Sequence, residues 1–276
     1  MKKLLNKIVP TPHINVLSLL GHSSCNRLNI TKTIYFNLKA FPFEIAIKLP
    51  VLIYGNIRIF SVGEVLLDSV VKKGMISLGK YVSSESFRSF STWDNHGQVI
   101  IKGRLIFNNG FLFRNYGVCE FGRNVNLGSN LEIFCQEKII WGNNVRTAAN
   151  GFYMDTDGHF MFDLNTQKVS KMTNPIIIGN SVWLGNSVRL KKGTIIPDKT
   201  IVASFSVLGK DYTKEGERLV IGGIPATILK RNILPILNLK EEGELKKTYF
   251  NNEKGCNLLL SNSDETYLTE CETNFF

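Results

Sequence analysis

Hydrophobic positions in the second half of the chain recur every six residues. Glycine or asparagine often follows each of them, and these residues adopt the positive φ of a tight turn most easily. An amphipathic helix would place its apolar residues three and four apart, and a hairpin strand would alternate, so each hexad predicts one short strand plus one turn. The aliphatic positions of this ladder are Ile178, Leu184, Leu190, Ile196, Val202 and Leu208.

Three such hexads close one triangular coil, and stacked coils pair as parallel strands about 4.8 Å apart. The sequence therefore predicts an all-β solenoid, a parallel β-helix whose aliphatic ladder lies inside. The same register extends upstream, with a two-residue slip before Trp141. Further inward positions are expected at Leu78, Ile101, Phe107, Phe113, Phe121, Leu127, Ile133, Trp141 and Val145.

The repeat divides the chain into four parts. Residues 1–54 lack it and are expected to form a helical or irregular cap, with short helices within 29–52 closing the open end of the stack. Residues 55–212 form the β-helix, interrupted by a loop at 160–177 that leaves one edge, commonly on a binding face. Residues 213–235 are expected to form an arm with a short helix, and 236–276 an acidic, mobile tail.

Charge and cysteine content narrow the function classes. The net charge is +10 over 276 residues, divided between −4 in residues 236–276 and +14 in the remainder. Such a basic body suits a phosphorylated ligand, or at most a peripheral membrane contact. Nucleic-acid motifs are missing, so we expect no nucleic-acid partner. We expect neither a membrane-spanning helix nor a signal peptide. The five scattered cysteines favour a reducing, cytoplasmic setting, with Cys119 and Cys135 in the core.

The segments IIIGNSVWLGNSVRLKKGTIIPDKTIVASFSVLGKD and GGIPATILK resemble the hexapeptide-repeat acyltransferases, such as the galactoside and maltose O-acetyltransferases. The upstream segments KLPVLIYG and KKGMISLGKY are more similar to acetyltransferases of capsule and polysaccharide assembly. The resemblance covers residues 55 to 231. It implies a left-handed β-helix, acetyl-CoA as acyl donor, a sugar hydroxyl as acceptor and a homotrimer with active sites between subunits.

The resemblance also implies a histidine general base just before the insertion loop, where MDTDGHF places His159. A sugar hydroxyl is a poor nucleophile, and a neutral imidazole can take its proton as the oxygen attacks a thioester. Asp157 or a backbone carbonyl would orient the ring. Taken alone, His159 could equally be a polar loop residue.

Further site residues follow from the same resemblance. Trp183 matches a tryptophan beside the pantetheine arm, and Asn186 a residue whose backbone N–H the family offers to the acyl carbonyl. Each has a plainer reading, as a core aromatic and as a turn residue. Coenzyme A would also contact Ser204, Lys210, Thr227 and Lys230, helped by Arg231 unless that side chain belongs to a solvated basic face.

The acceptor side departs from the family. The positions that bind the sugar in galactoside acetyltransferase align with Asn126, Gly128 and Gln136 here. The sugar-binding side chains are not kept, so a galactoside is in doubt as the substrate. Asn126 and Asn130 are candidates for holding another hydroxyl acceptor, whose identity the sequence does not give.

Two other functions stay open from the sequence, and a third is rejected. N-acetylation of an amino-sugar nucleotide would use a similar base, and a non-catalytic β-helix would only display a binding surface. A zinc carbonic anhydrase needs three converging histidines. Of His13, His22, His96 and His159, only His159 lies well inside the regular repeat, so no metal is expected.

Overall fold

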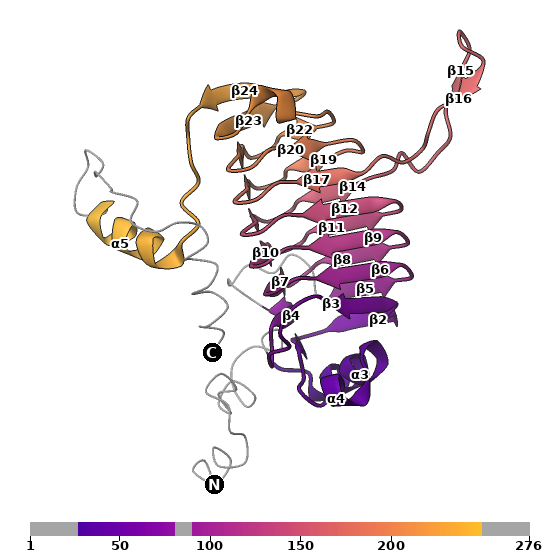
Figure 1. Cartoon of the computed structure of the whole chain (residues 1–276), viewed down its shortest axis with the longest axis vertical. Helices are drawn as coiled ribbons and strands as arrows, with labels where there is room; N and C mark the ends of the chain where they lie inside the picture. Colours follow the sequence, from indigo (N-terminus) through magenta and orange to yellow (C-terminus); the bar gives the residue numbers. More distant parts are fainter. Residues whose placement is uncertain (1–26, 81–89, 250–276) are drawn as a thin grey trace.

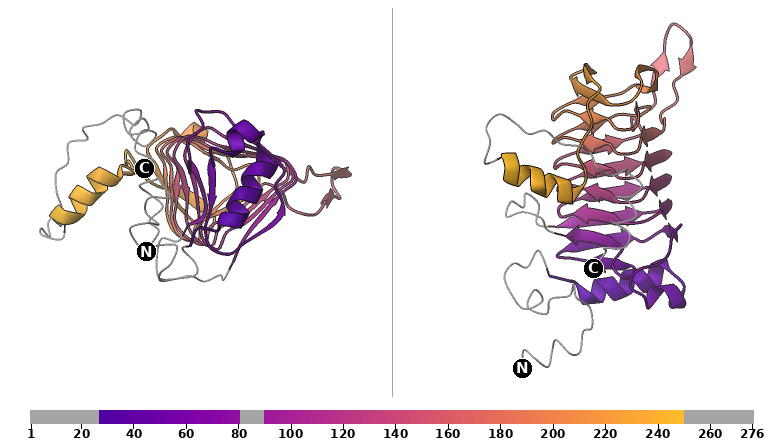
Figure 2. Two further views of the ribbon diagram at one scale, coloured as in Figure 1. Left: turned by 90° about the horizontal axis from the view of Figure 1, so that it is seen from below. Right: turned by 60° about the vertical axis from the view of Figure 1, so that its left-hand side comes forward.

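The computed structural model describes residues 27–80 and 90–249, and the chain forms the left-handed parallel β-helix that the repeat and the resemblance predict (Figure 1). Its three sheets enclose a triangular prism, seen along its axis in Figure 2 (left). No helix within the described residues is long and apolar enough to cross a bilayer.

Each face of the prism is one sheet, which takes every third strand along the chain apart from the loop strands β15 (Phe162–Asp163) and β16 (Lys168–Val169) and the C-terminal hairpin β23–β24. The first sheet has nine strands: β1 (Val51–Ile53), β4 (Ile76–Lys80), β7 (Leu105–Asn108), β10 (Val125–Leu127), β13 (Arg146–Thr147), β18 (Trp183–Leu184), β21 (Ile201–Val202), β23 (Leu219–Gly223) and β24 (Ala226–Arg231).

The other two faces contain seven and six strands. The seven-stranded sheet comprises β2 (Ile57–Ser61), β5 (Ser91–Asn95), β8 (Leu112–Asn115), β11 (Glu132–Cys135), β14 (Phe152–Met154), β19 (Arg189–Leu190) and β22 (Val207–Leu208). The six-stranded sheet comprises β3 (Glu64–Leu67), β6 (Gln98–Ile101), β9 (Val118–Phe121), β12 (Lys138–Trp141), β17 (Ile176–Ile178) and β20 (Ile195–Ile196).

The predicted ladder is confirmed, because every one of its positions is at most 1% exposed. The two-residue slip is a regular feature rather than a single irregularity. Glu132 pairs with Leu112 on one side and Phe152 on the other, so these coils contain 20 residues. Beyond the loop, Trp183 pairs with Ile201, which gives 18.

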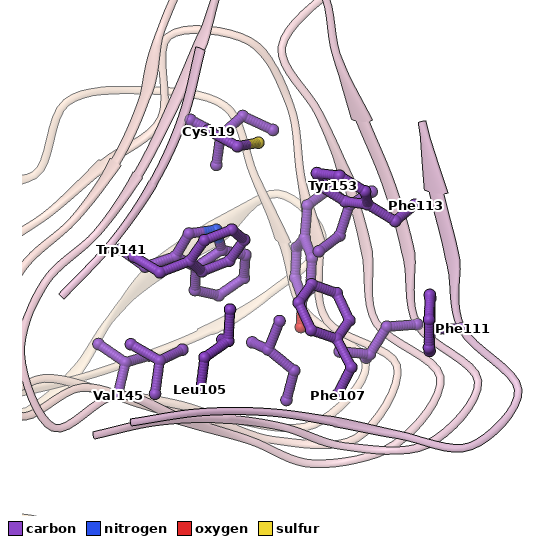
Figure 3. Packing of buried hydrophobic residues seen from close by; sticks show 14 of the residues in the cluster. Leu105, Phe107, Phe111, Phe113, Cys119, Trp141, Val145 and Tyr153 are labelled. Carbon is purple, nitrogen blue, oxygen red and sulfur yellow. The ribbon is translucent and has the colours of Figure 1, made fainter. Parts of the chain in front are cut away.

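The 20-residue coils enclose an aromatic core, whereas the later coils are filled mainly by aliphatic side chains. Trp93, Phe107 and Phe113 pack edge-on or tilted with ring centroids 4.6–6.1 Å apart. Phe121 stacks on Trp141 at 6.1 Å. Figure 3 shows part of this core, and Cys119, also labelled there, is buried as predicted together with Cys135.

Two helices close the first end of the prism, α3 (Ile30–Ala40) and α4 (Phe43–Ala46), within the segment expected to form a cap (Figure 1). The buried side chains of Thr33 and Asn37 bond the backbone of the edge strand β1. Asn37 accepts from Val51 N–H and donates to Val51 C=O, and Thr33 accepts from Ile53 N–H. The helix therefore supplies the partners that a further strand would otherwise provide.

The C-terminal arm corrects one prediction. Instead of a helix after the Gly-Gly turn, residues 219–231 form the antiparallel hairpin β23–β24 at the last coil, preceded by the 3-10 turn η2 (Thr213–Glu215). The stretch ATILKR includes the β-branched Thr227 and Ile228, and the turn at 223–225 returns it onto β23.

A helix occurs later, as α5 (Leu239–Tyr249), in a region expected to be a mobile tail. Asn238 caps it by accepting from Glu241 N–H, acidic residues lie in its first turn and lysines in its last. Arg146 on β13 holds its start through Glu242 and the carbonyl of Leu237, at 2.9 and 2.8 Å. The rest of the predicted tail, from residue 250 onward, lies outside the described residues.

Candidate active site

The insertion loop leaves the prism edge between the seven- and six-stranded sheets, which we call the loop corner. A column of buried residues lines this edge from the inside, one from each coil: Asn95, Asn115, Cys135 and Asp155. Asp155, fully buried, accepts the backbone N–H groups of residues 136, 137 and 138 at 2.8, 2.8 and 2.7 Å. One carboxylate thereby fixes the turn of the coil below and the chain entering the loop.

His159 is exposed at the start of the loop, one residue after Gly158. Gly158 has φ of 74°, a conformation that glycine adopts without strain, and its N–H donates to Thr156 Oγ1 at 3.1 Å. Beyond His159 the loop carries the small antiparallel hairpin β15 (Phe162–Asp163) and β16 (Lys168–Val169). It projects away from the prism (Figure 1) and ends before β17 begins at Ile176.

Asp157 has a different partner from the one proposed for it. Its carboxylate forms an ion pair with Lys192 of the next coil. Its backbone N–H donates to Met172 C=O at 3.0 Å, which ties the two ends of the loop together. Asp157 therefore anchors the base of the loop, and another group would have to orient the ring of His159.

Lys171 provides a second anchor, through a 2.7 Å contact with Glu137. Hydrogen bonds from Lys171 and from Thr173 hold the pKa of the Glu137 carboxyl below its ordinary value. That pKa is lower in the folded state than in the unfolded state. The contact therefore stabilises the fold above the unfolded pKa of about 4.3, and this stabilisation is lost as pH falls through the folded pKa.

We expect Glu137→Gln to increase amide hydrogen exchange in residues 160–175 at pH 7, relative to the unsubstituted protein. As the pH is lowered and Glu137 becomes protonated, the two proteins should converge once intrinsic exchange rates are corrected for. Exchange rates that match at pH 7 would contradict an anchoring role for this pair.

Trp183 lies on the outer face of the nine-stranded sheet, 42% exposed, and not in the core. Its neighbours across the strands are Arg146 and Ile201. Asn126 occupies the next coil beyond Arg146 on the same face, half-buried, with its Oδ1 3.5 Å from Asn108 Nδ2. Trp183 and Asn126 therefore share one face of the prism, and His159 lies on the edge between the other two sheets.

Asn186 and Ser204 contact each other across consecutive coils. The backbone N–H of Asn186 donates to Ser204 Oγ at 3.1 Å, and Asn186 Oδ1 accepts from Ala149 N–H at 3.0 Å. In this structure the N–H predicted to receive an acyl carbonyl is thus already bonded to a hydroxyl. Both residues build the turns that stack these coils.

The prediction for Asn130 is corrected by its burial. Its side chain is only 5% exposed and its φ is 57°, so it occupies a left-handed turn position that asparagine tolerates well. A buried turn residue does not present its amide to an acceptor on an open face.

Three predicted coenzyme A contacts gather at the C-terminal end of the prism. Lys210, Thr227 and Lys230 are all exposed. Lys210 Nζ lies 5.1 Å from the ring centroid of Tyr212, and Lys230 lies on β24 opposite Val220. Arg231 is engaged by Glu215 at 2.6 Å. The two lysines are thus exposed cations that could meet a phosphate.

The two halves of the candidate site lie on different sides of one chain. Figure 2 (left) shows the β15–β16 hairpin leaving one side of the triangle, while α5, which Arg146 holds beside the Trp183 face, projects from the opposite side. One chain alone therefore does not bring His159 and Trp183 together.

The sequence reasoning missed a groove at the loop corner, next to Gly158, with a volume of about 380 Å³. It also placed His96 outside the regular repeat, whereas His96 lies on this edge directly after β5. A period of 20 residues would have found both, since positions 96, 116, 136 and 156 follow the strands of consecutive coils. Within residues 27–80 and 90–249, no three His, Cys, Asp or Glu side chains cluster as metal ligands would.

Comparison with known proteins gives partial matches. The chain is 28% identical over 114 residues to the polysialic acid O-acetyltransferase of Escherichia coli O1:K1 / APEC, covering 41% of this chain and 36% of that protein. It is 28% identical over 111 residues to the galactoside O-acetyltransferase of Escherichia coli (strain K12), covering 40% and 53%. The chain thus matches about a third to a half of the length of these relatives.

Among solved structures, the polysialic-acid-specific acetyltransferase NeuO aligns over 78% of this chain and 91% of its own, with a TM-score of 0.48 and 17% identity. No family model matches the chain. The sequence matches confirm the resemblance to hexapeptide-repeat acetyltransferases.

Proposed function

We propose that this protein transfers the acetyl group of acetyl-CoA to a hydroxyl group of a sugar during assembly of a surface polysaccharide, with His159 as the general base. One observation carries the proposal: the exposed His159 stands at the start of the loop, directly after Gly158, which lines the groove at this prism edge. The names of the two O-acetyltransferases that the chain resembles support the reaction class.

The proposed reaction needs one proton acceptor and no covalent enzyme intermediate. Neutral His159 takes the proton of the acceptor hydroxyl as its oxygen bonds to the acyl carbon. The carbon–sulfur bond of the thioester then breaks, and the imidazolium returns the proton to the leaving thiolate. We assign the binding of the coenzyme to Trp183, Ser204, Lys210, Thr227 and Lys230, and the reaction to the cytoplasm, where free buried thiols such as Cys119 persist.

We further propose that the active unit is a homotrimer. His159 and Trp183 face different directions in one chain, and a closed threefold ring would set the loop corner of each subunit against the nine-stranded sheet of the next. In this arrangement one subunit supplies the base and its neighbour supplies the coenzyme wall.

The direct test incubates the full chain with radiolabelled acetyl-CoA and a panel of acceptors: a nitrophenyl galactoside, maltotetraose and a sialic acid tetramer. We expect base-labile label, as esters give, on at least one glycan. Label that appears only on the amine of an amino-sugar nucleotide would replace this proposal with N-acetylation. Coenzyme A binding without transfer to any acceptor would contradict it.

Mixing two inactive variants tests the shared site. We expect His159→Ala and Trp183→Ala to be nearly inactive alone. After denaturation and joint refolding in equal amounts, about one quarter of the interfaces would pair an intact His159 with an intact Trp183, and activity should recover to that level. The trimer would be contradicted if no activity returned after joint refolding, or if sedimentation showed a fully active 31 kDa species.

A further inference from the structure

We infer that the groove at the loop corner is a subsite for sugar units adjoining the acetylated one, so that the acceptor is an oligosaccharide or longer glycan. This inference rests on the proposed function and adds the length and the mode of binding of the acceptor. The groove ends at Gly158, the residue before His159. Its walls come from three consecutive coils: Arg114 and Tyr116, Phe134 and Gln136, Met154 and Thr156.

An exposed aromatic platform lies at the far end of this groove. Tyr116 is 53% exposed, and its ring stacks on that of His96 with centroids 5.1 Å apart and an interplanar angle of 5°. An exposed tyrosine ring offers a flat apolar face and a polar hydroxyl, which together match the mixed surface of a sugar ring. Exposed rings in water carry a cost unless something covers them, and a stacked sugar would do so.

The platform is held rigid from beneath by a buried carboxylate. Asp94, 7% exposed, contacts His96 Nε2 at 2.8 Å through one oxygen and Arg114 Nε at 3.1 Å through the other. The guanidinium of Arg114 in turn lies 5.9 Å from the ring centroid of Phe134. Recognition surfaces are effective when their side chains are fixed in advance, and this network fixes His96 and Arg114.

The middle of the groove is polar without a strong charge. Gln136 is exposed, and its Oε1 lies 3.4 Å from Thr156 Oγ1. An amide and a hydroxyl can both donate and accept hydrogen bonds, as sugar hydroxyls do. Because Asp94 offsets the charge of Arg114, the groove selects hydroxyl-rich rings more than anions.

The length of the groove sets the size of the ligand. From the coil of Tyr116 to that of Thr156 there are two strand spacings, roughly 10 Å. That distance is comparable with a disaccharide, so a glycan whose reactive hydroxyl reaches His159 would place a neighbouring unit over Tyr116. A monosaccharide would leave the platform uncovered.

The test compares acceptors of different length in the same panel, adding glucose and free sialic acid as the matching monosaccharides. For Tyr116→Ala we expect KM for the tetrasaccharide to rise at least about tenfold, while the monosaccharide and acetyl-CoA constants stay within about twofold. Tyr116→Phe keeps the ring and should stay close to the unsubstituted protein. Tyr35→Ala, at an exposed tyrosine on the cap helix, is the matched control.

The outcomes separate the groove from the chemistry. Acetyl transfer that is unaffected by Tyr116→Ala at every acceptor length would overturn the groove and leave the proposed function standing. If no acceptor is acetylated, calorimetric titration of each tetrasaccharide into the His159→Ala protein, with and without Tyr116→Ala, decides instead. Tetrasaccharide binding that is lost on Tyr116→Ala supports the subsite. Binding that is absent from both proteins, or equal in both, overturns it. A change in oligomeric state as the only effect of Tyr116→Ala would also overturn it.

Discussion

His159→Ala is expected to lower kcat by a factor of roughly 10²–10⁴, the usual loss when a general base is removed. The coenzyme A dissociation constant should change little, because His159 lies at the loop corner while the lysines assigned to the coenzyme lie at the C-terminal end of the prism. Steady-state acetyl transfer and calorimetric coenzyme titration measure the two quantities separately.

Lys210→Ala provides the contrast, because it should weaken coenzyme binding more than it slows the chemical step. A kcat that survives the loss of His159 within about threefold would remove the histidine from the mechanism.

Asp155→Ala is expected to have the largest effect on stability. Its carboxylate is fully buried and accepts three backbone N–H groups, so truncation leaves three donors inside the prism without their acceptor. Each buried donor left without an acceptor typically costs about 1–3 kcal/mol, so the three together should lower stability by several kcal/mol. Urea unfolding followed by circular dichroism should show a clearly lower midpoint.

Asp163→Ala is the matched control for this loss. Asp163 also accepts two backbone N–H groups, those of Asn165 and Thr166 at 2.8 and 3.3 Å, but it lies in the exposed loop hairpin. Water can replace its carboxylate, so the midpoint should not move measurably. Equal shifts of the urea midpoint for the two substitutions would mean that the burial of Asp155 adds nothing to the stabilisation by its hydrogen bonds.

The inward ladder was predictable because an inward position of a solenoid coil accepts only apolar side chains, and such a position recurs in every hexad. Ile178 and Leu208 are as buried as expected. The 20-residue period was harder to see, since the residues added to each wide coil are polar corner residues such as Gln136 and Glu137.

The C-terminal region escaped prediction for a different reason. Thr227 and Ile228 form a strand because β23 lies beside them, which is a tertiary effect. The helix α5 was signalled locally by Asn238 and by its charge order, but a lack of hydrophobic periodicity hid it. Hydrophobic pattern therefore predicts the repeats well and their flanking elements poorly.

For the candidate site, the sequence located His159 and the exposed lysines but not their surroundings. The sequence offered Asp157 as one group that could orient the ring, but its pairing with Lys192 depends on which residue of the next coil stacks beside it. The link between Asp94, His96 and Tyr116 joins residues whose common edge emerges only once the coils are stacked.

The contacts from Thr33 and Asn37 to β1 have a consequence for assembly. A chain shortened past residue 40 would expose the unpaired edge of β1 at the base of its column, and the strand edge of a second column could pair with it there. Head-to-tail fibres, visible by electron microscopy, would then form in place of discrete particles. The cap helix thereby sets where the stack stops growing.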